Sequence, residues 1–236
     1  MRHRVLKLVT IGITLMWVGA RVAATADSPA GVLGVKVAAY DVRDVSIIEA
    51  LRQLKQSVGD KEIILTLEVA PFEEKVEENI SLAISDGTVR EVLEQIIRLD
   101  PRYAYSVFQG ELIHVFPIRA KDDPNDLLNT KVKEFNISGV AYDRLLQYPD
   151  HYIPELGAEI LRRSKAGGVA GAMMSSTGVP SVSLEVRNAT VRNILNEISL
   201  RAARTTKARV TPLGWVYTYR VDKSVPLGGH PQWKLF

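Results

Sequence analysis

The chain has 236 residues, of which 46% are hydrophobic, enough for one or two globular domains with buried cores. Its formal charge of +3 disappears once residues 1–26 are set aside, because that segment carries four basic residues and no acid, leaving 26 basic and 27 acidic residues. This near-neutral balance gives no general attraction to phosphate, so no nucleic-acid partner is expected. The chain has no cysteine, which excludes disulfides, thiolate metal sites, a cysteine nucleophile and a lipid-modified N-terminal cysteine.

Residues 1–26 have the three-part plan of a secretory signal peptide. A basic start, MRHRVLK, precedes the apolar run Leu8–Ala20, and the small residues Ala24-Thr25-Ala26 follow. We expect cleavage after Ala26 or after Ala24, release of the mature protein into the periplasm, and membrane contact only through this segment. The apolar run is short for a membrane span, which takes roughly 20 residues. An uncleaved N-terminal anchor is the alternative.

Residues 40–69 predict a strand, a capped helix and a second strand. Tyr40 and Val42 take alternate, inward-facing positions of the first strand. Ser46 stands three residues before Glu49, the spacing of a helix capping box. The apolar residues that follow at helical spacing are Ile47, Ala50, Leu51 and Leu54. The run KEIILTLEV, residues 61–69, predicts the second strand, and the acidic EEKVEEN that comes after it predicts an exposed loop.

Two stretches have nearly the same sequence, ISLAISDGTVREVLEQI at 80–96 and VSLEVRNATVRNILNEI at 182–198. Each begins with alternating apolar residues, typical of a half-buried strand, and passes through a tight turn. Thr88 with Glu91 forms a second capping-box pattern, whereas Thr190 has the cap without the glutamate. Apolar residues at helical spacing come next in both copies, so each stretch predicts a strand, a turn and an amphipathic helix.

A fainter version of the same unit is KEFNISGVAYDRLLQY, where Phe135 and Ile137 are the strand residues and Ala141 stands at the cap position. Strand-like sequence also ends each half of the chain: YAYSVFQGELIHVFP, with a turn at Gln109-Gly110, and KARVTPLGWVYTYRV, with a turn near Pro212-Leu213-Gly214. The predicted fold class is α+β, with two tandem modules of about β-α-β-β-α-β-β, each with two helices packed on short sheets. The predicted boundaries are a signal peptide at 1–26, a first module at 35–119, a linker at 120–130, a second module at 131–222 and a C-terminal tail at 223–236.

The first module resembles the short N-terminal (STN-like) domain shared by secretins and TonB-dependent transducers. The resemblance is carried by YDVRDVSIIEALRQLKQSVGDKEIILTLEV followed by ISLAISDGTVREVLEQI; it covers residues 40–97 well and extends loosely to 117. The second module resembles this family in its second half alone. The resemblance implies a periplasmic protein-docking module of a secretion or signalling system, not an enzyme. No outer-membrane barrel or secretin core follows in this sequence, which leaves the pathway and the partner open.

The two modules differ most at SKAGGVAGAMMSSTGVPS, residues 164–181, which is rich in Gly, Ala and Ser. This composition favours a flexible loop. The alternative is a docking loop that becomes ordered on a partner, with Met173 and Met174 as adaptable apolar contacts.

Two further regions are candidates for partner contact. A basic cluster that includes Arg201 and Arg204 follows the last predicted helix, either as a solvated helix end or as a contact for an acidic partner. The strand-like regions 104–118 and 208–221 are predicted sheet edges, which can accept a partner strand. The candidate partner-binding residues are Met173, Met174, Arg201, Arg204, Tyr105 and Tyr217.

The sequence predicts no catalytic residue, no cofactor and no metal site. His114 lies in the apolar strand LIHVF without a second ligand at metal spacing, so we expect a hydrogen-bonded or surface histidine. His151 beside Asp150 is the stronger candidate for chemistry, although a loop histidine near an acid is common. The acidic KDDPND at 121–126 has carboxylates that could bind calcium, but it lacks the EF-hand spacing and the distant glutamate, so it predicts a solvated linker. His230 lies in the predicted tail.

The leading hypothesis is an exported, periplasmic, non-enzymatic docking protein whose partner is another protein of the cell envelope. A small exported enzyme is one alternative, and replacement of His151 and Asp150 tests it. A self-assembling envelope scaffold, that is, a homo-oligomer, is the other alternative, and light scattering tests it.

Overall fold

The computed structural model describes residues 31–59, 63–69, 79–163, 179–205, 215–220 and 230–235, which form a mixed α+β fold. The strands are β1 (Lys36–Val45), β2 (Ile64–Val69), β3 (Ile80–Thr88), β4 (Tyr103–Phe108), β5 (Leu112–Pro117), β6 (Lys131–Ala141), β7 (Ser181–Thr190), β8 (Trp215–Arg220) and β9 (His230–Leu235). The α-helices are α1 (Ile47–Ser57), α2 (Val89–Leu99), α3 (Tyr142–Gln147), α4 (Pro149–Tyr152), α5 (Pro154–Arg163) and α6 (Val191–Thr205). Three short 3-10 helices are η1 (Val32–Gly34), η2 (Ile118–Ala120) and η3 (Leu127–Asn129).

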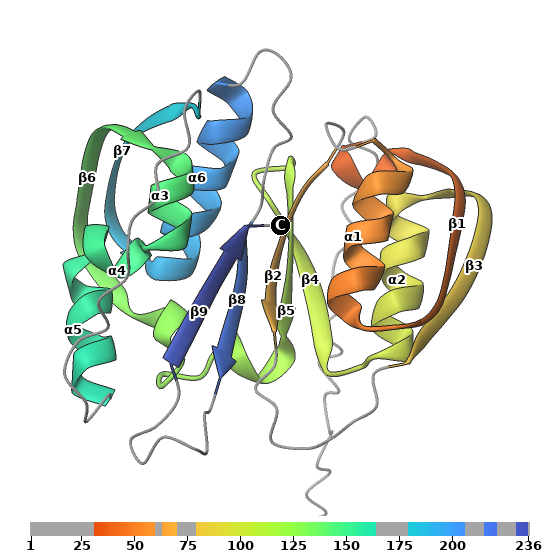
Figure 1. Cartoon of the computed structure of the whole chain (residues 1–236), viewed down its shortest axis with the longest axis horizontal. Coiled ribbons are helices and arrows are strands. Elements are labelled where there is room, and N and C mark those ends of the chain that lie inside the picture. The colour runs from red at the N-terminus through yellow and green to blue at the C-terminus, as the bar shows by residue number, and fades with distance from the viewer. Residues whose placement is uncertain are drawn as a thin grey trace, which may run out of the picture.

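Five layers of secondary structure are stacked across the molecule (Figure 1). The middle layer is a five-stranded sheet with the strand order β4-β5-β2-β8-β9. Helices α1 and α2 lie on one side of it and are followed by the antiparallel pair β1–β3, whereas α3 and α6 lie on the other side and are followed by β6–β7. Strand β8 separates the two cores: Val216 belongs to the first, and its neighbours Trp215 and Tyr217 belong to the second.

The central sheet takes strands from both halves of the chain. Strand β2 is its middle strand and pairs in parallel with β5 on one side and with β8 on the other. The pairs β4–β5 and β8–β9 are antiparallel. The two halves therefore share one sheet, whereas the sequence pattern predicted separate short sheets.

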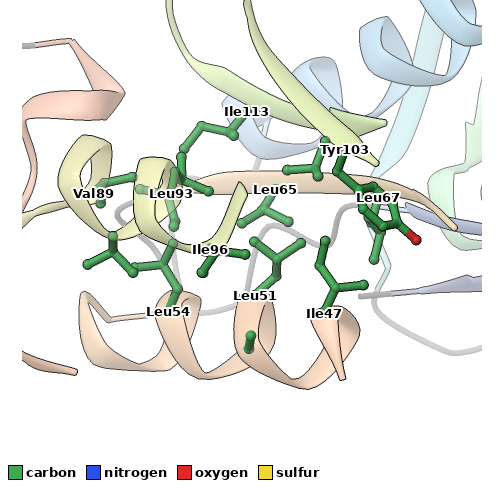
Figure 2. Packing of buried hydrophobic residues seen from close by; sticks show 14 of the residues in the cluster. Ile47, Leu51, Leu54, Leu65, Leu67, Val89, Leu93, Ile96, Tyr103 and Ile113 are labelled. Carbon is green, nitrogen blue, oxygen red and sulfur yellow. The ribbon is translucent and has the colours of Figure 1, made fainter. Parts of the chain in front are cut away.

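The first core lies between α1, α2 and the central sheet (Figure 2). The helix-face residues that the spacing predicts are fully buried: Ile47, Ala50, Leu51 and Leu54 of α1, and Val89, Val92, Leu93 and Ile96 of α2. They meet Leu65 and Leu67 of β2 and Ile113 of β5. Burial of a large apolar side chain contributes about 1.5–3 kcal/mol, so this layer is a main source of stability.

The helix caps follow the sequence closely. Thr88 and Glu91 form a reciprocal capping box at the start of α2. The Ser46 hydroxyl accepts the N–H of Glu49 at 3.3 Å, and the Thr190 hydroxyl accepts the N–H of the third helix residue in the same way. Helix α3 begins after Ala141 without a side-chain cap.

The two outer antiparallel pairs have the same irregularity at the same place. Strand β1 bulges at Asp44, with φ 54°, and β6 bulges at Gly139, with φ 64°. In each bulge the backbone N–H donates to a serine hydroxyl of the partner strand, from Asp44 to Ser81 and from Gly139 to Ser183, both at 3.0 Å. The left-handed backbone at these points is thus held by a hydrogen bond across the pair.

The second half departs from the predicted element order. Three helices, α3, α4 and α5, follow β6 in place of one, because Pro149 and Pro154 each start a new helix and cannot continue the preceding one. The predicted linker is solvated only in part: Asp122 and Asp123 are exposed, but Leu127 and Leu128 are buried in the second core.

The predicted C-terminal tail contains strand β9, which begins at His230 and pairs with β8. The predicted signal peptide, the loop residues 164–178 and the turn near 212–214 lie outside the described residues. In the portion of the chain that the structure describes, no helix combines the length and the apolar character needed to cross a bilayer.

Candidate functional site

Strands β2 and β5 are buried along their whole length, since both faces of the central sheet are covered. One face of β2 points Leu65 and Leu67 into the first core. The opposite face carries Ile64, Thr66 and Glu68 toward α6, and Ile64 packs there with Leu112 and Leu200. Polar side chains are thus buried between the central sheet and α6, where the two halves of the chain meet.

His114 of β5 is the centre of this polar group and is 2% exposed. Its Nε2 lies 2.8 Å from Oε1 of Glu68, and its Nδ1 lies 2.8 Å from the Thr66 hydroxyl. The ring is stacked on Phe116 and lies 5.3 Å, centre to centre, from the ring of Trp215. The expectation of a hydrogen-bonded histidine is confirmed.

Asn196 of α6 extends the network into the second half. Its side-chain oxygen accepts from the Thr66 hydroxyl at 3.3 Å and from the indole N–H of Trp215 at 3.2 Å. The network therefore connects β2, β5, β8 and α6 through buried polar atoms, each with a partner, as buried polar groups require.

Arg192 closes the network from the first turn of α6. Its guanidinium binds both carboxylate oxygens of Glu68, with Nη2 at 3.0 Å from Oε2, and also binds the side-chain oxygen of Asn129. Burial alone would raise the pKa of Glu68, but hydrogen bonds from His114 and Arg192 outweigh it, so the pKa of this carboxyl lies below its ordinary value. Burial opposes the charge of Arg192 too, yet the bond to Glu68 keeps its pKa above the ordinary value.

Asp126 is a second carboxyl beside the same guanidinium. Its Oδ1 accepts the N–H of Leu128 at 2.7 Å and lies 3.8 Å from Nη2 of Arg192. Burial, followed by the negative charge of Glu68, raises the pKa of Asp126 to about 6. An acidic residue predicted to be solvated is thus part of the buried network.

A hollow of about 210 Å³ opens beside these carboxyl groups. It is lined by Glu68, Val69, Pro117, Ala120, Asp123, Asn125, Asp126, Arg163 and Tyr217. Arg163 donates to the backbone carbonyl of Asn125, which joins α5 to the loop before η3. The hollow is small and bounded on several sides by charged groups that already have partners.

Thr66, His114 and Glu68 have the residue types of a hydrolytic triad but lack its accessibility. Thr66 is 0% exposed, lies on the middle strand of the sheet, and donates to Asn196. A nucleophile must be within reach of its substrate, and here the protein surrounds the hydroxyl. Over the described ranges, no group of three His, Cys, Asp or Glu side chains is arranged to hold a metal ion. The geometry suits a structural junction between the two cores.

The predicted contact residues lie in different environments. Tyr105 is half-buried on β4, and Arg201 is exposed on α6. Arg204 forms a salt bridge to Glu111 at 2.5 Å, and this salt bridge connects the two halves of the chain. Tyr217 is 5% exposed in the second core. Met173 and Met174 lie outside the described residues.

The predicted sheet edges need correction. Of the region 104–118, β4 is an outer strand, but β5 lies inside the sheet between β4 and β2. Of the region 208–221, residues 208–214 lie outside the described residues, and β8 lies inside the sheet between β2 and β9. The prediction was wrong for β8 because its partner β9 falls in sequence expected to be a tail.

His151 and Asp150 lie on the surface, away from the buried network. Their side chains are 38% and 33% exposed, and His151 Nε2 is 3.8 Å from the carboxylate. The ring of Tyr148 stacks on the histidine. The two residues lie close together. Among the described residues, no third polar side chain bonds to either of them.

The sequence did not single out the network residues Thr66, Glu68 and Arg192, and it predicted Asp126 to lie in a solvated linker. The sequence did hold one signal for two of them. In KEIILTLEV, Thr66 and Glu68 alternate with leucines, and a strand in the interior of a sheet is buried on both faces, so these two polar residues would be buried as well. Arg192 had no signal, since an arginine in the first turn of a helix is usually exposed.

A scan against protein-family models, a search of curated proteins and a search of solved structures each found no match to this chain.

Proposed function

We propose that this protein is an exported, non-enzymatic docking protein of the cell envelope that accepts an extended segment of a partner protein along strand β4. The observation that carries the proposal is the edge of the central sheet. Within the described part of the chain, β4 pairs with β5 on one side and with no strand on the other. Its sequence, YAYSVF, has neither a charge nor a proline, the two devices that commonly protect an edge from another strand.

The ladder between β4 and β5 fixes which backbone groups face outward. Ile118 donates its N–H to the carbonyl of Arg102, so this pair is a hydrogen-bonded one in the antiparallel register. Hydrogen-bonded pairs recur at every second residue, which directs the N–H and C=O of Tyr105 and Val107 away from β5. These four groups are the donors and acceptors for a partner strand.

The two-module architecture is part of the same proposal. It is supported by the matching bulges at Asp44 and Gly139, each bonded to a serine of the partner strand. It is also supported by Asp86 and Asn188, which have φ 56° and 53° at the same position of the repeated sequence. With the STN-like sequence pattern of residues 40–97 and the signal-peptide pattern of residues 1–26, these features favour a periplasmic docking module over an enzyme.

Site-specific photocrosslinking in cells tests the proposal. Ser106 is exposed on β4, and Ser85 is exposed on β3 in a distant layer, so a photoreactive amino acid at each position gives a matched pair. We expect an adduct with an envelope protein from position 106 and none from position 85.

A backbone variant separates strand addition from side-chain contact. Val107→Pro removes an outward N–H at little change in volume, whereas Val107→Ala keeps the N–H and shortens the side chain. The adduct should be lost in Val107→Pro and kept in Val107→Ala. An adduct that persists in Val107→Pro, or that forms equally at position 85, contradicts the proposal. An adduct between two copies of the chain would assign the edge to self-assembly.

A further inference from the structure

One guanidinium serves two carboxyl groups in the interior of this protein. Arg192 binds both oxygens of Glu68, and its Nη2 lies 3.8 Å from Oδ1 of Asp126. The side chains of Glu68, Arg192 and Asp126 are 2%, 11% and 16% exposed. A single positive charge balances one carboxylate, so ionisation of the second leaves a negative charge that is partly desolvated and repelled by the first.

We propose that Glu68, Arg192 and Asp126 form a proton-sensitive junction that holds the two cores together more firmly when Asp126 is protonated. The three side chains come from β2, from the first turn of α6 and from the segment before η3, so the junction spans both halves of the chain. A proton on Asp126 removes its repulsion against Glu68 and leaves the guanidinium to Glu68 and Asn129.

Charged groups face Asp126 from every side of the junction. Glu68 of β2 and Asp123 of its own loop oppose its ionisation, and Arg192 of α6 favours it. Arg163 of α5 lines the same hollow, and its side chain is bonded to Glu159. His114 of β5 acts through Glu68, to which it is hydrogen-bonded.

The direction of the pH dependence follows from the sign of the shift. The pKa of Asp126 rises from 3.8 to about 6 on folding, so the folded protein holds this proton more tightly than the unfolded chain. The stabilisation is complete below the unfolded value and is lost as pH rises through about 6. Above that value both states are ionised and the effect of pH on this group ends.

Urea unfolding of the purified protein and of Asp126→Asn, from about pH 4 to about pH 7.5, tests the proposal. Asparagine keeps the shape and the acceptor for Leu128 N–H but cannot ionise. Relative to the variant, the wild-type unfolding constant should rise about thirtyfold between pH 4 and pH 6, about double again by pH 7.5, and then stay constant. The control Asp41→Asn, at an exposed carboxyl on β1, should run parallel to the wild type.

A second measurement needs no variant. The amide of Leu128 is bonded to the Asp126 carboxyl, so its NMR chemical shift reports the charge of that group. We expect a midpoint near pH 6, and hydrogen exchange of β2 and α6 amides that accelerates together above it, after correction for the intrinsic rate. A Leu128 midpoint at or below about pH 4, or parallel stability curves for wild type and Asp126→Asn, would overturn the proposal.

Discussion

At the scale of single residues, Arg192 is the point on which the polar contacts between the two cores converge. Its guanidinium binds Glu68 on β2 and Asn129 beside η3, and Asp126 lies next to it. A buried charge of this kind is stable only with its partner, because removal of one member leaves the other desolvated and uncompensated. The junction therefore stabilises the fold only while Glu68 and Arg192 are both present.

Arg192→Leu should lower the free energy of unfolding by about 3–5 kcal/mol, since Glu68 would stay buried without its cation. Chemical denaturation measures the loss. The matched control is Arg162→Leu on α5, whose side chain is 67% exposed, and its unfolding midpoint should scarcely move. The double variant Glu68→Leu/Arg192→Leu should recover much of the loss, and equal destabilisation by Arg192→Leu and Arg162→Leu would contradict this view.

At the scale of elements, the two outer antiparallel pairs are built with the same device. Each places one residue with positive φ in a bulge and anchors its N–H on a serine hydroxyl across the pair. Bulges bend and twist a strand, which allows a short two-stranded sheet to curve over two helices. Glycine at position 139 takes this conformation without a steric penalty, whereas Asp44 takes it with a Cβ.

Ser183→Ala should cost about 1 kcal/mol, because the N–H of Gly139 loses its acceptor. Ser81→Ala should cost a similar amount for the same reason at Asp44. Thermal or urea unfolding checks both, with Ser85→Ala as the control at an exposed position of β3. A change in Ser85→Ala as large as in the other two would show that the loss comes from something other than the bulge.

Local features of this fold could be predicted from the sequence, and distant pairings could not. The helix faces of α1 and α2 and the cap at Thr88 depend on residues a few positions apart, so their spacing reveals them. The pairing of β2 with β8 and the contact of Glu68 with Arg192 join residues far apart in the chain, and no period in the sequence marks them. Strand β9, HPQWKL, contains a proline and lacks apolar alternation, which is why it was expected to be a tail.

At the scale of the whole molecule, one sheet belongs to both cores. Val216 of β8 is packed in the first core although its strand follows α6, and its neighbours complete the second. The first core thus takes a residue from the second half of the chain, the hydrophobic residues of the second core all lie between 127 and 217, and the shared sheet joins the two. The two halves should therefore lose their structure in one transition.

Val216→Ala should lower stability by about 2 kcal/mol through the loss of two buried carbon atoms and the cavity that they leave. Hydrogen exchange should show equal loss of protection in α2, which packs in the first core, and in α6, which packs in the second. Loss confined to α2 would mean that the cores open separately, in which case the shared sheet would not couple them.

The position of β2 has a consequence for how the chain reaches its final state. A ribosome or an export channel delivers residues from the N-terminus onward, so β2 emerges long before β8, its parallel neighbour. Until β8 and α6 arrive, one edge and one face of β2 remain in water, and that face carries Glu68 without its arginine. Long-range parallel pairing is slow to form, and exposed strand edges invite wrong partners in the meantime. Folding of this protein is thus completed only after β8 has been made. Until then, the unpaired edge of β2 is available for a chaperone to bind.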